Sequence, residues 1–192
     1  DESVTDPEHP FFWTGYYQNW NSRCAACHTT NFEKQFNSET NQYHSTWTDA
    51  NVACESCHGS GQEHIKSITD KTYSSDNTGL KDLGEKLIFH FSDGDPIARL
   101  QQSPQGPSLA LDTCGACHSR RSELQEPSGT EPYHQQFQLE GLNEPLYFSD
   151  GQIREEVFVL GSFLQSKMAE AGVTCTNCHD PHTGKTLLPG AQ

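Results

Sequence analysis

The sequence predicts a small, mainly α-helical and irregular fold with little or no β-sheet, whose side chains supply only part of its core. Hydrophobic residues make up 32% of the 192 residues, below the roughly 45–50% usual in soluble domains, a count that includes glycine. Aromatic residues at 10% argue against a disordered chain. All eight cysteines fall into four copies of one short pattern. A bound group must therefore supply the missing apolar volume, and the cysteines indicate where it is held.

The four copies are CAACH, CESCH, CGACH and CTNCH. Each has two residues between its cysteines and a histidine directly after the second one, which is the attachment motif of haem c. This spacing puts both thiols on one helical turn, within reach of two vinyl groups of one porphyrin, and the histidine becomes the proximal iron ligand. The sequence thus predicts four covalent haems. They are held by four cysteine pairs, Cys24 with Cys27, Cys54 with Cys57, Cys114 with Cys117 and Cys175 with Cys178, and their proximal ligands are His28, His58, His118 and His179.

Three other uses of paired cysteines compete with this interpretation. Disulfides do not require a histidine after every second cysteine, and a thioredoxin-like redox motif would occur once, near a βαβ pattern. Zinc ribbons also use such pairs and are the strongest rival. The histidine in all four copies favours haem c. Because haem is attached to reduced thiols outside the cytoplasmic membrane, we expect a periplasmic or extracellular protein, with its signal peptide already removed before Asp1.

Six histidines lie outside the motifs, whereas four haems with two axial histidines each would need four of them. This surplus favours electron transfer over catalysis, which needs an open or exchangeable iron position. The strongest candidates follow a motif closely, in CHGSGQEH and CHDPH, and are too near their own haem to cap it easily, so we expect each to reach a neighbouring haem. At least two of the others must also be ligands. The six, strongest first, are His64, His182, His9, His134, His44 and His90.

We expect one domain over residues 1–192, in which 1–64 carry haems 1 and 2, 65–113 form a polar connection and 114–192 carry haems 3 and 4. Because 192 residues shared by four haems leave 48 for each, the haems should stack in contact and form the core of a small multihaem cytochrome c.

Local patterns predict the remaining elements. Each CxxCH motif should start or end a helical turn, and 152–171 has the spacing of a longer helix closed by Gly172. The stretch around His90 resembles a strand, and the proline-containing segment 96–108 resembles a loop.

The charge balance excludes several partners. With 26 acidic and 12 basic residues the formal charge is −14, which argues against nucleic acid, where affinity comes from neutralising phosphates, and against anionic membrane surfaces. No apolar run approaches the roughly 18 residues of a membrane span. Redox partner proteins or extracellular electron acceptors are the expected partners.

Several long strings, among them TGYYQNWNSRCAACHTTNF, TWTDANVACESCHGSGQEH and DGQIREEVFVLGSFLQSKMAEAGVTCTNCHDPHTGK, resemble the bacterial multihaem c-type cytochromes related to hydroxylamine oxidoreductase and cytochrome c nitrite reductase. The resemblance implies that His64 and His182 match histidines of the family, and that His9 fits its segment before the first haem. A short secreted four-haem chain also resembles extracellular cytochromes that polymerise into conductive filaments. In those, a haem can take its distal ligand from the next subunit, a role that the resemblance implies for His9 or His182.

Two rivals to a non-enzymatic electron carrier remain. A small reductase of nitrogen oxyanions or hydroxylamine would need one open haem and a cationic pocket, which Arg120 and Arg121 could line, although we favour haem propionates as their partners. A haem subunit of a larger oxidoreductase could dock through the aromatic segment HPFFWTGYY.

Overall fold

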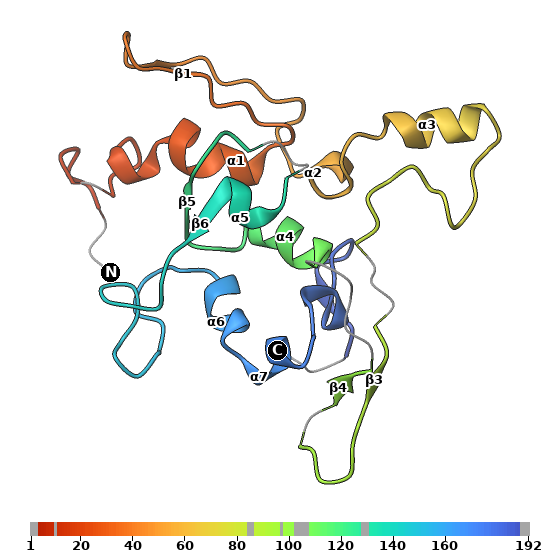
Figure 1. Cartoon of the computed structure of the whole chain (residues 1–192). Coiled ribbons are helices and arrows are strands. Elements are labelled where there is room, and N and C mark those ends of the chain that lie inside the picture. Colours follow the sequence, from red (N-terminus) through yellow and green to blue (C-terminus); the bar gives the residue numbers. More distant parts are fainter. Residues whose placement is uncertain are drawn as a thin grey trace. The chain divides into compact units, whose positions relative to one another are not determined.

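A computed structural model of the chain (Figure 1) describes residues 4–9, 11–83, 87–96, 98–101, 108–127 and 131–188. They form two compact units, Asp1–Leu80 and Lys81–Gln192. The first unit contains the first two CxxCH motifs and the second contains the other two. The division falls inside the predicted connection 65–113, and a single domain unified by its haems stays a prediction.

In the described part of the first unit, short helical segments alternate with one hairpin. The chain coils through one 3-10 turn and one π turn into the first motif, and an eight-residue helix follows the second motif. The elements are η1 (Tyr16–Gln18), η2 (Trp20–Cys24), α1 (Ala25–His28), β1 (Phe36–Asn37), β2 (Gln42–Tyr43), α2 (Cys54–His58) and α3 (Gln62–Thr69).

The hairpin is longer than its two named strands. Phe36 lies opposite Tyr43 in the β1–β2 pair, and isolated bridges in the same register join Glu33 to Thr46 and Thr30 to Asp49. The chain thus leaves the first motif, runs out along one side and returns along the other to the second motif (Figure 1). Because the two ends of a hairpin are adjacent, this loop brings the end of motif 1 next to the start of motif 2.

The described part of the second unit has three separate two-stranded antiparallel sheets and several helices of three to seven residues. Its strands pair as β3 with β4, β5 with β6 and β7 with β8. The elements are β3 (Phe89–His90), β4 (Arg99–Leu100), α4 (Leu109–Gly115), β5 (Arg121–Glu123), α5 (Tyr133–Gln136), β6 (Phe137–Leu139), α6 (Leu160–Leu164), α7 (Lys167–Glu170), η3 (Cys175–Asn177), β7 (His179–Asp180) and β8 (Lys185–Thr186).

The hydrophobic core of the second unit is small. Tyr133, Phe137 and Leu160 form its buried centre. Gly115, between the cysteines of motif 3, lies directly against it, because a Cβ there would come within 2.8 Å of Leu160 Cδ2 and 3.2 Å of a Tyr133 ring carbon. The third motif is therefore packed onto the one apolar cluster of this unit that the described residues form.

The predicted helix over 152–171 is wrong in its first half and interrupted in its second. Ile153 forms a bridge with Tyr147 instead, and Phe158 has a φ of 59°, which a right-handed helix does not accommodate. Ser166 then separates α6 from α7 by accepting a hydrogen bond from the backbone N–H of Ala169. Side-chain spacing alone could not reveal these competing backbone pairings.

The predicted end of that helix is confirmed. Gly172 has a φ of 87°, and its N–H donates to the carbonyl of Ala169 while the N–H of Val173 donates to that of Met168. These two bonds are those of a Schellman motif, in which glycine at the left-handed position closes a helix.

The strand expected around His90 is confirmed as β3. The loop expected over 96–108 is wrong at Arg99–Leu100, which form β4 because Leu100 pairs with Phe89 and Arg99 with His90. Residues 97 and 102–107 of that segment, with Pro104 and Pro107, lie outside the described residues.

One buried hydroxyl joins the first two motifs. Thr30 is fully buried, and its Oγ1 donates to the carbonyl of Asn51 at 2.7 Å and accepts from the backbone N–H of Ala53 at 2.8 Å. The Ser56 hydroxyl, inside CESCH, lies 2.9 Å from the same oxygen. Thr30 follows His28 by two residues, so it fixes the end of motif 1 against the start of motif 2.

We expect Thr30→Val to lower the free energy of unfolding by about 1–3 kcal/mol, because it leaves the Asn51 carbonyl and the Ala53 N–H without this partner at a part-buried site. Thr30→Ser keeps the hydroxyl and should cost only about 1 kcal/mol for its lost methyl. Denaturant unfolding of the haem-loaded protein measures both, and equal losses in the two variants would contradict the role of the hydroxyl.

Candidate haem-attachment sites

Each CxxCH motif starts or ends a helical turn, as predicted, although His179 of the fourth motif itself lies in β7. Motif 1 lies at η2 and α1, and motif 2 forms α2. Motif 3 begins in α4 and continues for one more turn, where the N–H of His118 donates to the carbonyl of Cys114 at 2.9 Å. Motif 4 begins η3. Residues three apart in a helix share a face, so in each motif the two thiols lie on one side of the turn.

Backbone hydrogen bonds fix the spacing of the two cysteines in the later motifs. The N–H of Cys117 donates to the carbonyl of Cys114 at 3.2 Å, and the N–H of Cys178 donates to that of Cys175 at 3.1 Å. In motif 1, Cys24 is the last residue of η2, and Cys27 lies within α1, which follows directly. In motif 2, Cys54 begins α2 and Cys57 lies within it. The second cysteine of every motif is therefore one turn after the first.

The eight cysteines are thiols that take part in no disulfide. Cys54 and Cys178 are exposed, and the half-buried ones are Cys24, Cys27, Cys57, Cys114, Cys117 and Cys175. Among the described residues, no three histidine, cysteine, aspartate or glutamate side chains come together as a group that could hold a metal ion. The thioether bonds to haem stay a prediction for all eight cysteines, Cys27, Cys57 and Cys117 included.

Motifs 3 and 4 meet at their first cysteines. The Cys114 thiol donates a hydrogen bond to the sulfur of Cys175, which lowers the pKa of Cys175 to about 7. The contact follows from the packing of η3 against α4. Within the second unit, the attachment points of two successive motifs are therefore neighbours, as Thr30 makes the ends of motifs 1 and 2 neighbours in the first.

The motif histidines differ in their exposure. His58 is half-buried, whereas His28, His118 and His179 are exposed. A histidine that is a haem ligand needs an open face toward the iron, so exposure in the polypeptide alone fits a proximal role. Asp180, directly after His179, has its pKa lowered, chiefly by the hydroxyl of Thr183, which donates to it. A carboxylate therefore stands beside the fourth proximal position.

Among the candidate distal ligands, His64 has a half-buried ring that contacts two other residues. It lies half-buried near the start of α3, its Nδ1 is 2.7 Å from the carbonyl oxygen of Thr78, and its ring packs edge-on against Tyr73 at 6.0 Å between centroids. The ring is thus held in one orientation by contacts from outside its own helix.

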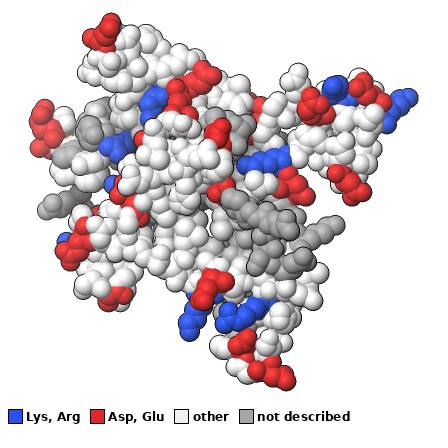
Figure 2. All heavy atoms as spheres, viewed as in Figure 1, with Lys and Arg blue, Asp and Glu red and all other residues white. Residues whose placement is uncertain are grey.

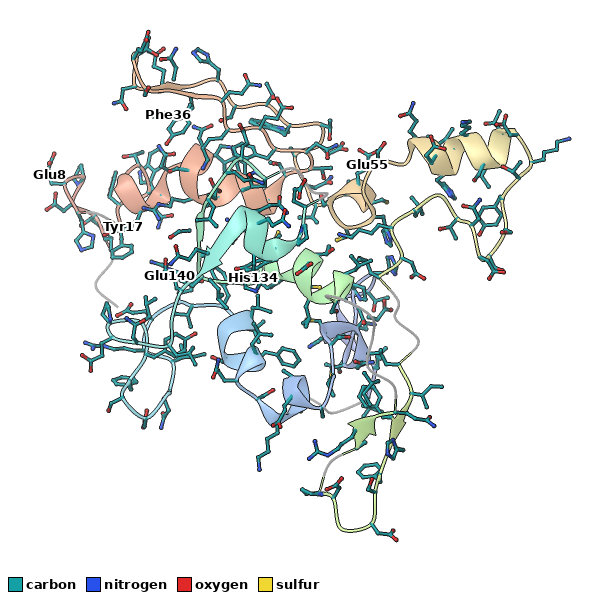
Figure 3. All side chains as sticks on the ribbon, viewed as in Figure 1. Glu8, Tyr17, Phe36, Glu55, His134 and Glu140 are labelled. Carbon is teal, nitrogen blue, oxygen red and sulfur yellow. The ribbon has the colours of Figure 1, made fainter. Side chains whose placement is uncertain are left out.

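The other five candidates are exposed. His9 accepts a hydrogen bond at Nδ1 from the backbone N–H of Phe11 at 3.2 Å, and His182 has its Nδ1 3.8 Å from a carboxylate oxygen of Asp180. His134, labelled in Figure 3, lies edge-on to Tyr133 at 5.0 Å. The remaining two stand on the two hairpins that contain β2 and β3. They are His44 and His90.

The ligand assignments of these ten histidines stay predictions. In the polypeptide alone, the distal candidates are distributed over separate elements, and the contacts given above join His64, His9, His182 and His134 to other residue types. Ligand pairing through an iron atom would be completed by the haem.

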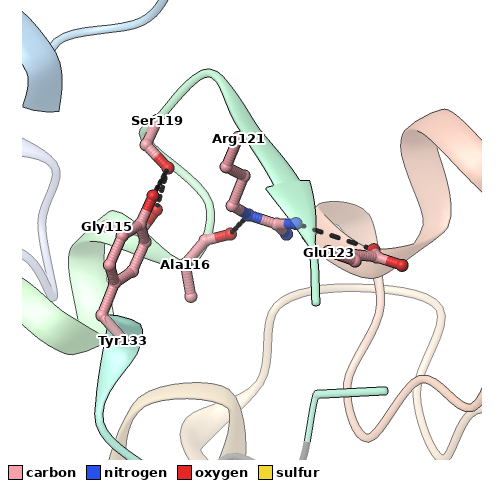
Figure 4. Close-up of polar contacts among 6 residues, drawn as sticks. All are labelled: Gly115, Ala116, Ser119, Arg121, Glu123 and Tyr133. Atoms are coloured by element: carbon pink, nitrogen blue, oxygen red, sulfur yellow. Dashed lines mark hydrogen bonds and ion pairs between the residues drawn. The ribbon is translucent and has the colours of Figure 1, made fainter. Parts of the chain in front are cut away.

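Arg121, one of the two arginines that the sequence suggested for a cationic pocket, is bound within the fold. Arg121 Nε donates to the carbonyl of Ala116 at 2.7 Å, its guanidinium covers the Phe137 ring at 3.8 Å, and it lies 3.6 Å from Glu123 (Figure 4). With 10% of its side chain exposed, Arg121 fastens motif 3 to the β5–β6 hairpin. Arg120 is exposed.

The same close-up shows a second tie that the sequence did not signal. Ser119 is buried, and its hydroxyl donates to the carbonyl of Gly115 at 2.7 Å and lies 2.7 Å from the Tyr133 hydroxyl (Figure 4). Burial raises the pKa of Tyr133. Because Ser119 follows His118 directly, this pair fixes the end of motif 3 in the core.

In the first unit, Glu55 does similar work within motif 2. Its carboxylate, labelled in Figure 3, accepts from the backbone N–H of Gly61 and from the Asn31 side chain, both at 2.9 Å. These bonds lower the pKa of Glu55, the one to Gly61 most. The turn between His58 and α3, which leads to His64, is thereby held by the motif itself.

The polypeptide exposes more surface than its mass should. Its accessible area is 14133 Å², whereas a globular protein of 21.4 kDa exposes about 9,100 Å² and two separate domains of half that mass about 11,000 Å² together. The described chain buries only eight hydrophobic residues, three of them alanines, and leaves aromatic side chains such as Trp13 and Phe91 more than 70% exposed. These exposed aromatic side chains are apolar surface that bulky porphyrins would cover.

Within the described residues, no helix has the length and apolar character needed to cross a membrane. On the face drawn in Figure 2, acidic side chains are spread widely and lysines and arginines are scattered among them. This pattern agrees with the formal charge of −14.

We expect four haems per chain in the purified protein, measured by the pyridine haemochrome assay against protein concentration. Replacing both cysteines of one motif, as in Cys175→Ser with Cys178→Ser, should reduce the ratio to three. The matched control is Ser56→Ala, which lies inside a motif and keeps both thiols. An unchanged ratio in the double variant would show that the fourth motif holds no haem.

Comparison with known proteins agrees with this chemistry. Residues 14–59, which contain the first two motifs, match the family model described as cytochrome c554 and c-prime. No curated protein and no solved structure matches the chain. The match supports a c-type cytochrome that binds haem c covalently and transfers electrons, and such proteins are typically periplasmic or extracellular.

Proposed function

We propose that the protein carries electrons through four covalent haems, each with two axial histidines, in the periplasm or outside the cell. The observation that carries this proposal is the repetition, four times, of two thiols on one helical turn followed by a histidine. The family match covers the first two of these motifs only, so the count of four rests on the identical local arrangement of the other two.

The motifs occur as neighbouring pairs within each unit. Thr30 ties motif 1 to motif 2, and the packing of η3 against α4 brings motif 4 beside motif 3. When bound, each haem iron supplies a site that stores and releases one electron by changing between its ferric and ferrous states. Neighbouring attachment points support electron exchange inside each pair, without long insulating stretches of protein between the sites.

The chain's histidines favour transfer over catalysis. Ten histidines exceed the eight that four six-coordinate irons require, so no iron needs to be left open to substrate. Histidine at both axial positions keeps the reduction potential below that of a histidine–methionine site. The excess of acidic side chains stabilises the more positive ferric state further.

The rival reductase needs an open iron beside an anion-binding pocket. Arg121, one of the two cations proposed for such a pocket, is bound by Ala116, Phe137 and Glu123. Its guanidinium is therefore committed to the fold of motif 3, which supports the electron carrier over the reductase.

The electron paramagnetic resonance spectrum of the oxidised protein, with and without nitrite and cyanide, tests the function. We expect four low-spin ferric signals that neither anion changes, because histidines occupy both axial positions of every haem. A high-spin signal that shifts when nitrite is added would reveal an open iron, and the reductase would then be the better proposal.

The resemblance to filament-forming cytochromes gives a second proposal, a homopolymer in which His9 or His182 ligates a haem of the next copy. Both side chains are exposed in the single chain, as an intermolecular ligand requires. If the chain docks as a haem subunit on a larger oxidoreductase, it would use exposed aromatic residues near His9. Trp13, for example, is 77% exposed.

We expect concentrated wild-type protein to form filaments in negative-stain images, and His9→Ala or His182→Ala to abolish them and turn one low-spin haem high-spin. Gln42→Ala is the control, because it changes an exposed side chain of a hairpin and leaves every histidine in place. Wild-type protein that elutes as a monomer at high concentration would rule the polymer out.

A further inference from the structure

The hydrogen bond between His64 and Thr78 defines which ring nitrogen carries the proton. A backbone carbonyl oxygen can only accept, so Nδ1 of His64, 2.7 Å away, must be the donor. In the neutral ring, Nε2 is then left with its lone pair free. This is the protonation state that an imidazole needs to bind iron through Nε2.

His9 shows the opposite arrangement. Its Nδ1 accepts from the N–H of Phe11, so in that conformation a neutral ring carries its proton on Nε2. To ligate through Nε2, His9 would first have to give up this contact and change tautomer, whereas His64 needs no such change. The two histidines therefore differ in how ready they are to ligate.

The reach of the Thr78 carbonyl depends on the next residue. Gly79 lies against the first turn of α3, where a Cβ would stand 2.6 Å from the backbone nitrogen of His64 and 2.7 Å from the carbonyl carbon of Glu63. These neighbours are backbone atoms of a helix and cannot move aside. Gly79 also has a φ of 68°, which glycine alone adopts without strain.

Further contacts hold the returning chain in place. The Ser67 carbonyl accepts from the backbone N–H groups of Thr72 and Tyr73, and the Ser67 hydroxyl donates to the carbonyl of His64 at 2.8 Å. Tyr73 in turn packs against the His64 ring. The helix, its closing turn and the segment 78–79 thus form one frame around the imidazole, all within the first unit.

We propose that Gly79 is a positioning residue, which lets the Thr78 carbonyl hold Nδ1–H of His64 and so orients Nε2 and makes it a stronger axial ligand of a haem. A carbonyl that accepts from the far nitrogen raises the basicity of a ligating imidazole and fixes its plane. The more basic ligand stabilises ferric iron, so this contact lowers the reduction potential of one haem. The inference rests on the proposed role of His64 as a distal ligand.

The test uses the haem-loaded full chain and three variants. His64→Ala should convert one low-spin haem to high-spin and so identify the haem concerned. Gly79→Ala should keep that haem low-spin but raise its midpoint potential, shift its g values and let added imidazole replace His64 at a concentration roughly 10- to 100-fold lower. The other three haems should not change.

Gly151→Ala is the matched control. Gly151 has a φ of 85° and no atom that a Cβ would meet within 4 Å, so alanine there brings the same backbone strain without a displaced carbonyl. It should leave all four potentials and the imidazole titration unchanged. A shift in this control equal to that of Gly79→Ala would overturn the proposal, because general strain would then explain both.

The outcomes distinguish the role of His64 as a haem ligand from the role of Gly79 in positioning it. If His64→Ala leaves every haem low-spin with unchanged potentials, His64 is not a ligand and its proposed role fails. If His64→Ala gives a high-spin haem but Gly79→Ala leaves that haem's potential, g values and imidazole titration as in the wild type, only the positioning role of Gly79 fails.

A measurement on the wild-type protein applies if Gly79→Ala does not fold. The Nδ1 proton of the axial histidine gives an exchangeable, hyperfine-shifted NMR signal, assigned to His64 by its loss in His64→Ala. It should exchange slowly in D₂O, because the carbonyl of Thr78 binds it in a half-buried position. Exchange as fast as that of a solvent-exposed imidazole would overturn the proposal.

Discussion

The main constraint on this fold is the small amount of apolar volume that its described residues bury. Eight hydrophobic residues are buried in the described chain, and its helices span three to eight residues, too few to be stable in isolation. Two-stranded hairpins are likewise marginal on their own. The proposed covalent haems would offset this shortage, because a porphyrin bound through two thioethers is a large rigid apolar plate that short elements can pack against.

Polar contacts decide where each attachment point lies. Thr30, Ser119 and Arg121 are buried or nearly so, and each follows a motif histidine within three residues. Each of the three binds backbone groups of its own unit, and Arg121 also covers the Phe137 ring of the apolar cluster. A buried polar contact has defined distances and directions, so it can orient a motif more narrowly than apolar contact can. These residues therefore orient the chain just beyond His28 and His118.

The hydrogen bond at Nδ1 distinguishes histidines that look equivalent in the sequence. His64 donates from Nδ1 to a carbonyl and His9 accepts at Nδ1 from an amide, although both are near a haem motif or its entry segment. A surplus of histidines thus does not make them interchangeable. The partner of the second nitrogen decides whether a ring presents a lone pair or a proton to an iron.

The sequence by itself determined the helical turn and the two thiols of each CxxCH motif. It also predicts the haem attachment and the proximal ligand within the same five residues, because so local a spacing needs no tertiary information. It also predicted the strand at His90, from a short aromatic stretch. The helix end at Gly172 was predictable because glycine readily adopts the positive φ that closes a helix. Only the tertiary structure decided that 152–155 leaves the helix to pair with 146–148, that Cys114 meets Cys175, and that Thr78 reaches His64. These pairings depend on where the backbone turns, which leaves no mark on composition or periodicity.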